Sequence, residues 1–410
     1  MGSSFLGKIR SITNEQASKS GSQLWYSRLD EKMDRVEPYT RSDLSKCPRW
    51  AHAFAAQRKD HRYYELLEDT IHPEFNYGYF AIWNDAGDIC AVQPFFILEQ
   101  DLLVGVSPRW GALIGRLRSV LPRFMRLRTL MVGCVAGEGH LDADEENSRR
   151  SLARTLAVGI TEHAKNLRAP LIVLKEFPAR YRTSLSEFLL RGFTRLPSLP
   201  MTRVSIDFSS FDDYMMGALN SATRTKLRRK YRAAEKTPKI ELSIVRDVTS
   251  IINDIYPLYV AVYNRSKLHF EKLTQDYFCN LGRLMPEKVR FFIWRQNGKI
   301  IGFAECMIHE TAFYAEYIGL DYGTALDLHL YHWMYRDMVS WAIANGYKEF
   351  RSSGLNYDPK LHFRHLLDPI DLYVRHTSRI VNSALKLLLP FLDPTKYDAT
   401  LQKFANYKEL

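Results

Sequence analysis

Two stretches of this chain, about 210 residues apart, share one pattern. Residues 79–92 read YFAIWNDAGDICAV and residues 291–303 read FFIWRQNGKIIGF. Each consists of an aromatic and β-branched run, a polar turn that contains glycine, and a second apolar run, which is typical of a β-hairpin. Each hairpin precedes further strands and then a helix followed by a strand. We therefore expect an α/β (α+β) fold of two similar lobes, each with a mixed, largely antiparallel sheet flanked by helices.

Helical spacing supports this repeat. Between residues 328 and 344 apolar side chains recur every three or four positions, and Gly346 stands where a C-terminal cap belongs. Residues 151–164 have the same spacing. The prolines of residues 196–200, LPSLP, indicate a linker. We expect a diverged N-terminal lobe at residues 1–196, a C-terminal lobe at 197–370 and a helical extension at 371–410.

Composition agrees with two folded domains and gives no sign of a metal or disulfide framework. The chain has 410 residues, 46% of them hydrophobic, and five scattered cysteines with no Cys-x-x-Cys pair. That suits a reducing cytosol. His329 with His332 and His362 with His365 stand three apart, but the spacing supplies no third zinc ligand. We predict no metal.

Apolar runs long enough to span a bilayer, about 18 residues, are absent from the sequence. The longest candidate, residues 380–392, is interrupted by Asn382, Lys386 and Pro390, and reads as a docking helix or as a membrane-surface helix. Residues 116–128 alternate basic and apolar side chains, which fits a membrane contact, a segment that closes over a long substrate, or a basic surface loop. The first 16 residues do not resemble a secretory signal.

Positive charge is concentrated in residues 220–236, NSATRTKLRRKYRAAEK. Seven Lys or Arg side chains surround one acid there, which leaves +6 of the chain's formal +11. On a helix, Arg224, Arg228 and Arg232 form one stripe with Arg229 beside it. Such a stripe can contact phosphates or another anionic donor. A solvated helix face is the alternative.

The order of these elements resembles the GNAT superfamily of acyltransferases. Within it, the chain resembles the branch of Fem-type aminoacyl transferases and peptidoglycan biosynthesis/recognition proteins. The resemblance covers most of residues 197–363 and, more weakly, the first half as a tandem copy. It rests on residues 210–214 (SFDDY), 224–229 (RTKLRR), the strand pair 290–308, the strand 313–321 (FYAEYIGLD), the helix and strand that end at 353–354, and the tail 357–363 (YDPKLHF).

The resemblance implies an acyl-transfer site in the C-terminal lobe. A lysine in the tail of the Fem-type branch is implied to hold its ammonium over the tetrahedral oxyanion, and here that lysine is Lys360. Glu305 and Glu316 fall on neighbouring expected strands where GNAT-like sites receive the amine, so either could relay its proton. We assign Tyr314 and Tyr357 to substrate or donor binding. A surface lysine and lone strand acids are the alternatives.

The identity of the acyl donor is inferred from one difference between this chain and the usual GNAT sequence pattern. Conventional members bind the coenzyme A pyrophosphate on free backbone N–H groups of a glycine-rich turn. The equivalent residues 320–327, LDYGTALD, contain one glycine and two acids that would repel a pyrophosphate. The Fem-type branch takes its acyl group from aminoacyl-tRNA and does not need that turn. We therefore expect acyl-CoA or aminoacyl-tRNA as donor substrate, with the second favoured.

Together these observations predict a cytoplasmic enzyme, membrane-peripheral at most, that transfers an acyl or aminoacyl group to an amine or hydroxyl acceptor in cell-envelope or natural-product biosynthesis. One alternative is an acyl-CoA-dependent N-acetyltransferase of a small amine or amino sugar. Another is a non-catalytic recognition protein for an anionic polymer. The expected partners are the activated donor, with tRNA or an anionic envelope precursor, and not DNA.

Overall fold

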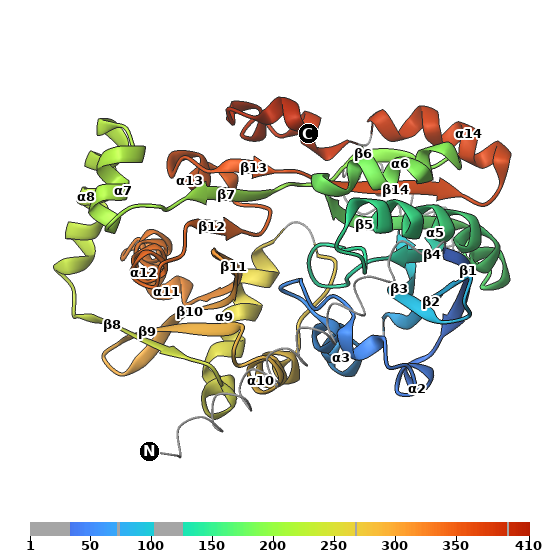
Figure 1. The fold of residues 1–410 in the computed structure, drawn as a ribbon. Helices are drawn as coiled ribbons and strands as arrows, with labels where there is room; N and C mark the ends of the chain where they lie inside the picture. The colour runs from blue at the N-terminus through green and yellow to red at the C-terminus, as the bar shows by residue number, and fades with distance from the viewer. Residues whose placement is uncertain (1–32, 72–73, 102–125, 267–268, 392) are drawn as a thin grey trace, which may run out of the picture.

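The structure is a computed structural model that describes residues 33–71, 74–101, 126–266, 269–391 and 393–410 (Figure 1). The N-terminal 16 residues considered above lie outside the described residues. So does most of the basic stretch 116–128, of which only residues 126–128 are described, as the start of strand β4 (Arg126–Val132). Two lobes stand side by side, each built on one seven-stranded sheet. The expected fold class is confirmed, since helices flank two mixed sheets of the same strand order.

The first sheet has the strand order β1-β2-β3-β4-β5-β14-β6. Only β4 and β5 pair in parallel, and every other neighbouring pair is antiparallel. The repeated hairpin predicted at residues 79–92 lies within β2 and β3. The strands are β1 (Met33–Tyr39), β2 (Asn76–Asn84), β3 (Ile89–Asp101), β4 (Arg126–Val132), β5 (Leu171–Pro178), β14 (Ile370–His376) and β6 (Thr194–Pro197).

The second sheet repeats this arrangement in the order β8-β9-β10-β11-β12-β7-β13. Here the one parallel pair is β11 with β12. The second predicted hairpin lies within β9 and β10. The strands are β8 (Ile240–Val245), β9 (Val289–Gln296), β10 (Lys299–His309), β11 (Ala312–Leu320), β12 (Glu349–Ser352), β7 (Met201–Ser205) and β13 (Leu366–Asp368).

The two sheets exchange one strand. β7 follows β6 in the chain but joins the second sheet beside β12, whereas β14 follows β13 but joins the first sheet beside β5. The expectation of a purely helical extension from residue 371 is therefore wrong. Residues 371–376 belong to β14, because the buried Tyr373 and Val374 complete the first lobe's core between β5 and β6. The helix expected from residue 380 follows as α14 (Arg379–Leu388).

Helices occupy matching places in the two lobes. α5 (Glu146–Asn166) connects β4 with β5, and α12 (Leu330–Ala344) connects β11 with β12, as the apolar spacing predicts. Both bury an apolar face against their sheet. The other helices are α2 (Arg41–Leu44), α3 (His61–Thr70), α6 (Arg182–Leu190), α7 (Phe211–Ala218), α8 (Ser221–Glu235), α9 (Ile252–Arg265), α10 (Gln275–Leu284), α11 (Tyr322–Ala325) and α13 (Tyr357–His362).

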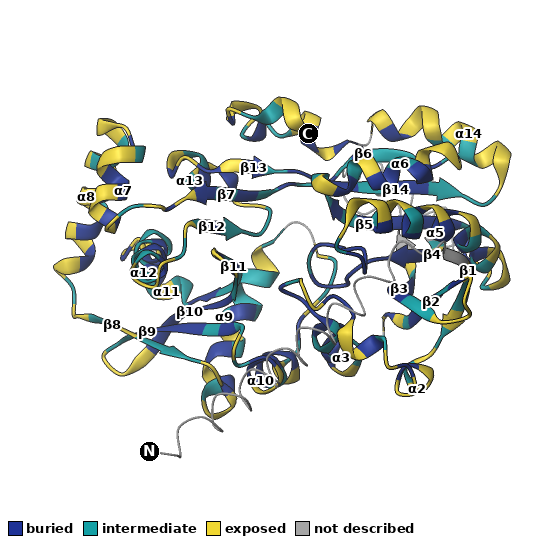
Figure 2. Cartoon of the chain, viewed as in Figure 1, coloured by how far each residue is buried: buried dark blue, intermediate teal, exposed yellow. Residues whose placement is uncertain are grey.

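A single apolar core runs between the lobes, where buried residues gather in the middle of the molecule (Figure 2). α3 of the first lobe packs against α10 of the second. Their contact includes a hydrogen bond of 3.0 Å between the hydroxyls of Tyr63 and Tyr277, both fully buried. The interface is therefore built like a domain interior, and polar groups inside it require partners.

Candidate functional site

Two acids stand where the strands of the second lobe separate. The parallel pairing of β11 with β12 has its last partners at Ala315 and Ser352. On the other side of β11, Cys306 of β10 pairs with Ala315 and Glu305 pairs with Tyr317, which leaves Glu316 as the extra residue of a β-bulge. Bulges of this kind re-aim side chains next to functional sites. The structure thus brings the predicted residues Glu305 and Glu316 onto adjacent strands at one place.

Cations from the first lobe reach Glu316. The Arg58 guanidinium lies 2.8 Å from its Oε1, and the Lys59 Nζ lies 3.4 Å from its Oε2. Arg58 also lies over the ring of Tyr314, 3.9 Å from its centroid. Both cations come from the turn before α3 and are almost fully buried. An interior charge needs such partners, so the two lobes are joined by an ion-pair cluster.

Glu138, also from the first lobe, completes the cluster. Arg58 donates to both of its carboxylate oxygens, at 2.7 and 2.9 Å, and Lys59 lies 3.5 Å away. Burial opposes ionisation, but these two cations outweigh it and hold the pKa of Glu138 well below its usual range. Burial lowers the pKa of the neighbouring His140 to about 4, so this imidazole is neutral at pH 7. Two cations therefore face two carboxylates.

Glu305 differs from the other acids of the cluster. It is fully buried, and neither carboxyl oxygen makes a hydrogen bond of normal geometry to a described residue, although the Tyr277 hydroxyl is near enough to oppose the rise of its pKa. Burial, with the Glu316 carboxylate beside it, raises the pKa of Glu305 to about 8. Glu305 therefore holds a proton at neutral pH. A carboxyl group poised near the working pH can take up and release a proton, which is what acyl transfer to an amine requires.

Lys360 lies on α13 and is buried. Its Nζ donates to the carbonyl oxygens of Ser353, at 2.5 Å, and Leu355, at 2.8 Å. Burial lowers the pKa of Lys360 to about 7, so the amine is partly neutral near physiological pH. Its hydrogen-bond partners among the described residues are thus backbone carbonyls that follow β12, and not the acid cluster. The proposed oxyanion role of Lys360 stays a prediction.

The two tyrosines assigned to binding have different surroundings. Tyr314 lies between two cations, since Arg351 approaches its ring to 5.6 Å from the centroid in addition to Arg58. Tyr357 is buried, donates its hydroxyl to the carbonyl of Pro200 at 2.9 Å and packs against Phe404. Tyr314 thus belongs to the acid cluster, whereas the contacts of Tyr357 are those of a core residue.

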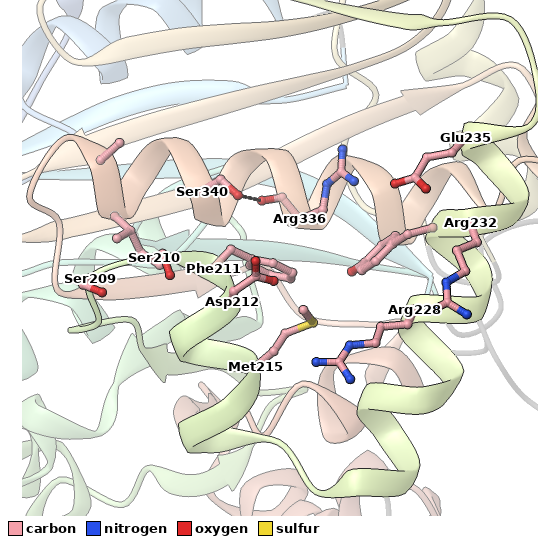
Figure 3. Close-up of a pocket in the computed structure, with 13 residues that line it drawn as sticks. Ser209, Ser210, Phe211, Asp212, Met215, Arg228, Arg232, Glu235, Arg336 and Ser340 are labelled. Carbon is pink, nitrogen blue, oxygen red and sulfur yellow. Dashed lines mark hydrogen bonds between the residues drawn. The ribbon is translucent and has the colours of Figure 1, made fainter.

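The basic helix α8 is unbroken and carries Arg224, Arg228 and Arg232 at four-residue spacing, but the contacts of these side chains differ. Arg228 and Arg232 line a cavity of about 570 Å³ between α7, α8 and α12, together with Arg336 (Figure 3). Arg224 donates to the carbonyl of Leu219 at 2.5 Å. Arg229 is near enough to His329, at the start of α12, to lower its pKa, after burial and Lys230. The predicted anion contacts therefore divide between this cavity and the start of α12.

Backbone donors in the turn after β11 already have an acceptor. Asp321 caps α11, and its Oδ1 accepts a hydrogen bond from the N–H of Gly323 at 3.0 Å. The N–H groups of Thr324 and Ala325 both bond to the Asp321 carbonyl. Lys299 holds the other oxygen of this carboxylate at 2.7 Å. A fixed carboxylate thus occupies the turn after β11, at the start of α11.

Sequence reasoning did not find Arg58, Lys59 and Glu138. Arg58 and Lys59 look like an ordinary surface pair, and Glu138 lies in a glycine-containing loop. The only local sign that these charged residues are buried is the sequence beside them, which is aromatic after residue 62 and apolar around residue 134. Their partner Glu316 is more than 170 residues from each of them, as the sequence numbers show. Among the described residues, no group of three His, Cys, Asp or Glu side chains could hold a metal ion.

Fold and site define a two-lobed GNAT-like protein with a charged centre between its lobes. A family described as FemAB-like, peptidoglycan biosynthesis/recognition, matches residues 139–361, so the chain belongs to that family and the resemblance seen in the sequence is confirmed. No curated protein matches the chain. Membership extends over both lobes, since the match begins before α5 and ends in α13.

Of three similar solved structures, the first supports the fold. FemX is 12% identical, with a TM-score of 0.50 over 80% of this chain and 94% of that one. L-PGS from Bacillus licheniformis is 11% identical, with a TM-score of 0.46 over 80% and 94%. A tandem GNAT protein of clavulanic acid biosynthesis is 10% identical, with a TM-score of 0.43 over 84% and 99%. At these identities the likeness concerns the fold alone.

Proposed function

We propose that this protein is a transferase of cell-envelope biosynthesis that moves an aminoacyl group from an activated donor to an amine of an envelope precursor. Family membership supports the class of pathway. The observation that carries the chemistry is Glu305, a buried carboxyl with a pKa of about 8 and no hydrogen bond of normal geometry to a described residue. Unpaired buried acids are costly, and active sites are where such groups are retained.

The proposed reaction needs one proton to change places. The acceptor nitrogen attacks the acyl carbon, a C–N bond forms, and the bond from that carbon to the donor's ribose oxygen breaks. Ionised Glu305 takes the proton from the nitrogen and returns it to the departing oxygen, so no charge is lost or gained overall. Arg58 and Lys59 act as positioning residues, because they hold Glu316 beside Glu305.

Aminoacyl-tRNA is the donor that the turn after β11 favours. Asp321 already accepts the Gly323 N–H, and its negative charge would repel a coenzyme A pyrophosphate. The basic side chains of α8 offer phosphate contacts elsewhere. Arg229 and Lys230 lie near His329 at the start of α12, and Arg228 and Arg232 line the adjoining cavity. Acyl-CoA is the second candidate donor.

The amine of Lys360 is proposed to stabilise the oxyanion. Its two hydrogen bonds to carbonyl oxygens leave one donor of the ammonium form free. Because its pKa is about 7, this role fades as pH rises while that of Glu305 grows. The two groups together predict a bell-shaped pH profile with its limbs near pH 7 and 8.

A transfer assay tests the proposal. Purified protein is given bulk aminoacyl-tRNA with labelled amino acids, or labelled acetyl-CoA, and a peptidoglycan precursor peptide as acceptor. We expect labelled product from aminoacyl-tRNA only, and loss of at least about 100-fold in Glu305→Gln. Lys360→Ala should lower kcat far more than it weakens donor binding. Product from acetyl-CoA alone would overturn the donor assignment, and full activity of Glu305→Gln would overturn the relay.

A further inference from the structure

An unusual surface lies on the first lobe at α14 and the short helix η4 (Leu389–Phe391) that continues it. No residue of α14 is buried, although most of them are apolar. Ile380 is 84% exposed, Leu387 74% and Phe391 71%. Folded proteins expose single apolar side chains routinely, but a run of them on one element marks a contact surface. The view coloured by burial shows this helix along the outside of the molecule (Figure 2).

The exposed side chains share one face of the helix. At 100° per residue, Ile380, Ala384 and Leu387 fall within about 60° of one another, with Val381 and Leu388 beside them. A different face holds α14 on the protein. Leu385 packs against the core, and Asn382 donates to the Gly192 carbonyl at 2.9 Å. The apolar face therefore points outward while the helix itself is held in place.

The end of α6 extends this surface. Leu190 is 78% exposed, and it lies two residues before Gly192, which Asn382 of α14 contacts. On the other side, Tyr397 is exposed and donates its hydroxyl to the carbonyl of Phe391. We call this set the α14 surface; it comprises Leu189, Leu190, Ile380, Val381, Leu387, Leu388, Phe391 and Tyr397.

Positive charge borders the α14 surface. Arg375, at the end of β14, is near enough to Arg379 and Arg191 that, after burial, these two cations lower its pKa. Lys386 is exposed on α14. Lys396 extends to the carbonyl of Pro390 at 3.0 Å, next to Phe391. An apolar face with a basic border and aromatic residues is the composition of a helix that lies in the headgroup region of a membrane.

We propose that the α14 surface docks the protein onto an anionic lipid bilayer. The apolar side chains enter the boundary between headgroups and acyl chains, while Arg191, Arg375, Arg379 and Lys386 contact lipid phosphates. A second copy of this chain is a poorer occupant, because a symmetric contact would bring the same cations together. No helix among the described residues is long and apolar enough to cross a membrane, and surface docking needs none.

Vesicle sedimentation of the full chain tests this docking. The vesicles are phosphatidylcholine alone, or phosphatidylcholine with about one third phosphatidylglycerol. We expect the protein to bind the anionic vesicles and to release in high salt. The double variant Leu387→Ser/Phe391→Ser should bind at least about tenfold more weakly. Arg379→Gln/Lys386→Gln should lose about tenfold on anionic vesicles.

Val158→Ser is the matched control, since Val158 is a half-exposed apolar residue on α5 of the same lobe. It should bind vesicles like the wild type. Thermal unfolding and sedimentation velocity without lipid accompany each variant. Equal binding by wild type and both double variants would overturn the proposal. So would a wild-type dimer that becomes monomeric in Leu387→Ser/Phe391→Ser, because the surface would then be a contact between copies. These readouts do not depend on transfer activity.

Discussion

The two lobes differ most at the point where their sheets open. In the first lobe the parallel pairing of β4 with β5 has its last partners at Val132 and Leu174. In the second lobe β11 and β12 have theirs at Ala315 and Ser352. The parallel pair occupies the same place in the strand order of each sheet, the fourth and fifth strands. Chemistry at these two places is therefore directly comparable.

Both acids of the second lobe have non-ionisable counterparts in the first. Gly133 follows the last pair of β4 where Glu316 follows that of β11. Pro94 stands one residue before the strand partner of Val132, just as Glu305 stands one residue before the strand partner of Ala315. The Gly133 N–H donates to the Pro94 carbonyl at 3.1 Å. The first lobe has no proton-carrying side chain at either position.

Residues 133–139 instead close the opening of the first lobe. A side chain on Gly139 would place its Cβ 2.7 Å from the Lys175 carbonyl oxygen, so only glycine allows this approach. The same segment carries Glu138 toward Arg58 and Lys59. One copy of the repeat thus supports the other. The first lobe supplies both cations and Glu138, and the second lobe supplies Glu305 and Glu316.

The largest effect is expected when that support is removed. Arg58→Met leaves Glu138 and Glu316 without their shortest partner in a buried setting, and should destabilise the protein by about 3–5 kcal/mol. Urea unfolding measures it. Arg154→Met is the control within the first lobe. Arg154 is exposed and its partner Glu187 keeps Arg150, so the change should cost less than about 1 kcal/mol. Similar losses of stability in both variants would mean that the cluster between the lobes stabilises the protein no more than an exposed arginine does.

Glu305→Gln should separate stability from activity. Since the pKa of Glu305 is raised from 4.5 to about 8, the folded state binds the extra proton, and wild-type stability falls as pH rises from about 4.5 to 8. Gln carries no charge at any pH. The variant should therefore be more stable than wild type at pH 7, by about 3 kcal/mol, and the difference should shrink toward pH 4.5.

Thermal unfolding of both proteins across this pH range checks the sign. Transfer activity, measured in parallel, should fall while stability increases, which is the trade-off expected of an active-site acid. If Glu305 had only a structural role, Glu305→Gln would lower stability and leave transfer activity unchanged. If Glu305→Gln destabilises the fold at every pH, the acids of the second lobe have a structural role only, like their counterparts Pro94 and Gly133 in the first lobe.

Local patterns account for much of this fold. The hairpins at residues 79–92 and 291–303 and the helices α5 and α12 follow from apolar periodicity, which depends only on neighbouring residues. The exchange of β7 and β14 could not be predicted in this way. Both are short strands, and nothing in their own sequences tells which of two similar sheets each will join.

The same limit applies to the site. Glu305 and Glu316 were accessible to sequence reasoning because a hairpin places neighbouring strands together. Their cationic partners were not, because Arg58 and Lys59 come from a turn of the other lobe and become buried only when α3 packs against α10. Arg224, Arg228 and Arg232 form a stripe by helical geometry, with Arg229 beside it. Their contacts could not be predicted in this way, since Arg224 bonds the Leu219 carbonyl while Arg228 and Arg232 line the cavity.

Gly137→Ala should disturb the position of Lys59 in the cluster between the lobes, with a moderate loss of stability and activity. Gly137 has φ +106°, and an added Cβ would lie 2.0 Å from the Lys59 Nζ, so Lys59 must move. Gly87→Ala is a matched control with φ +82° and no atom within 4 Å of the added Cβ. Both variants incur about 1 kcal/mol of backbone strain. Only Gly137→Ala should also lose transfer activity and further stability, and equal behaviour would show that Lys59 does not need its position.

The smallest effect concerns the helix that follows each opening. In the second lobe Asp321 caps α11 through the Gly323 N–H, whereas Glu145, at the start of α5 in the first lobe, makes no side-chain cap bond. Asp321→Ala should therefore cost about 1 kcal/mol in thermal unfolding, and Glu145→Ala less than about 0.5 kcal/mol. Asp321→Ala also frees the N–H of Gly323. If coenzyme A then stabilises the variant but not the wild type, the Asp321 carboxylate is what excludes a pyrophosphate. If coenzyme A stabilises the wild type equally well, the opening of the second lobe accepts that donor despite its cap.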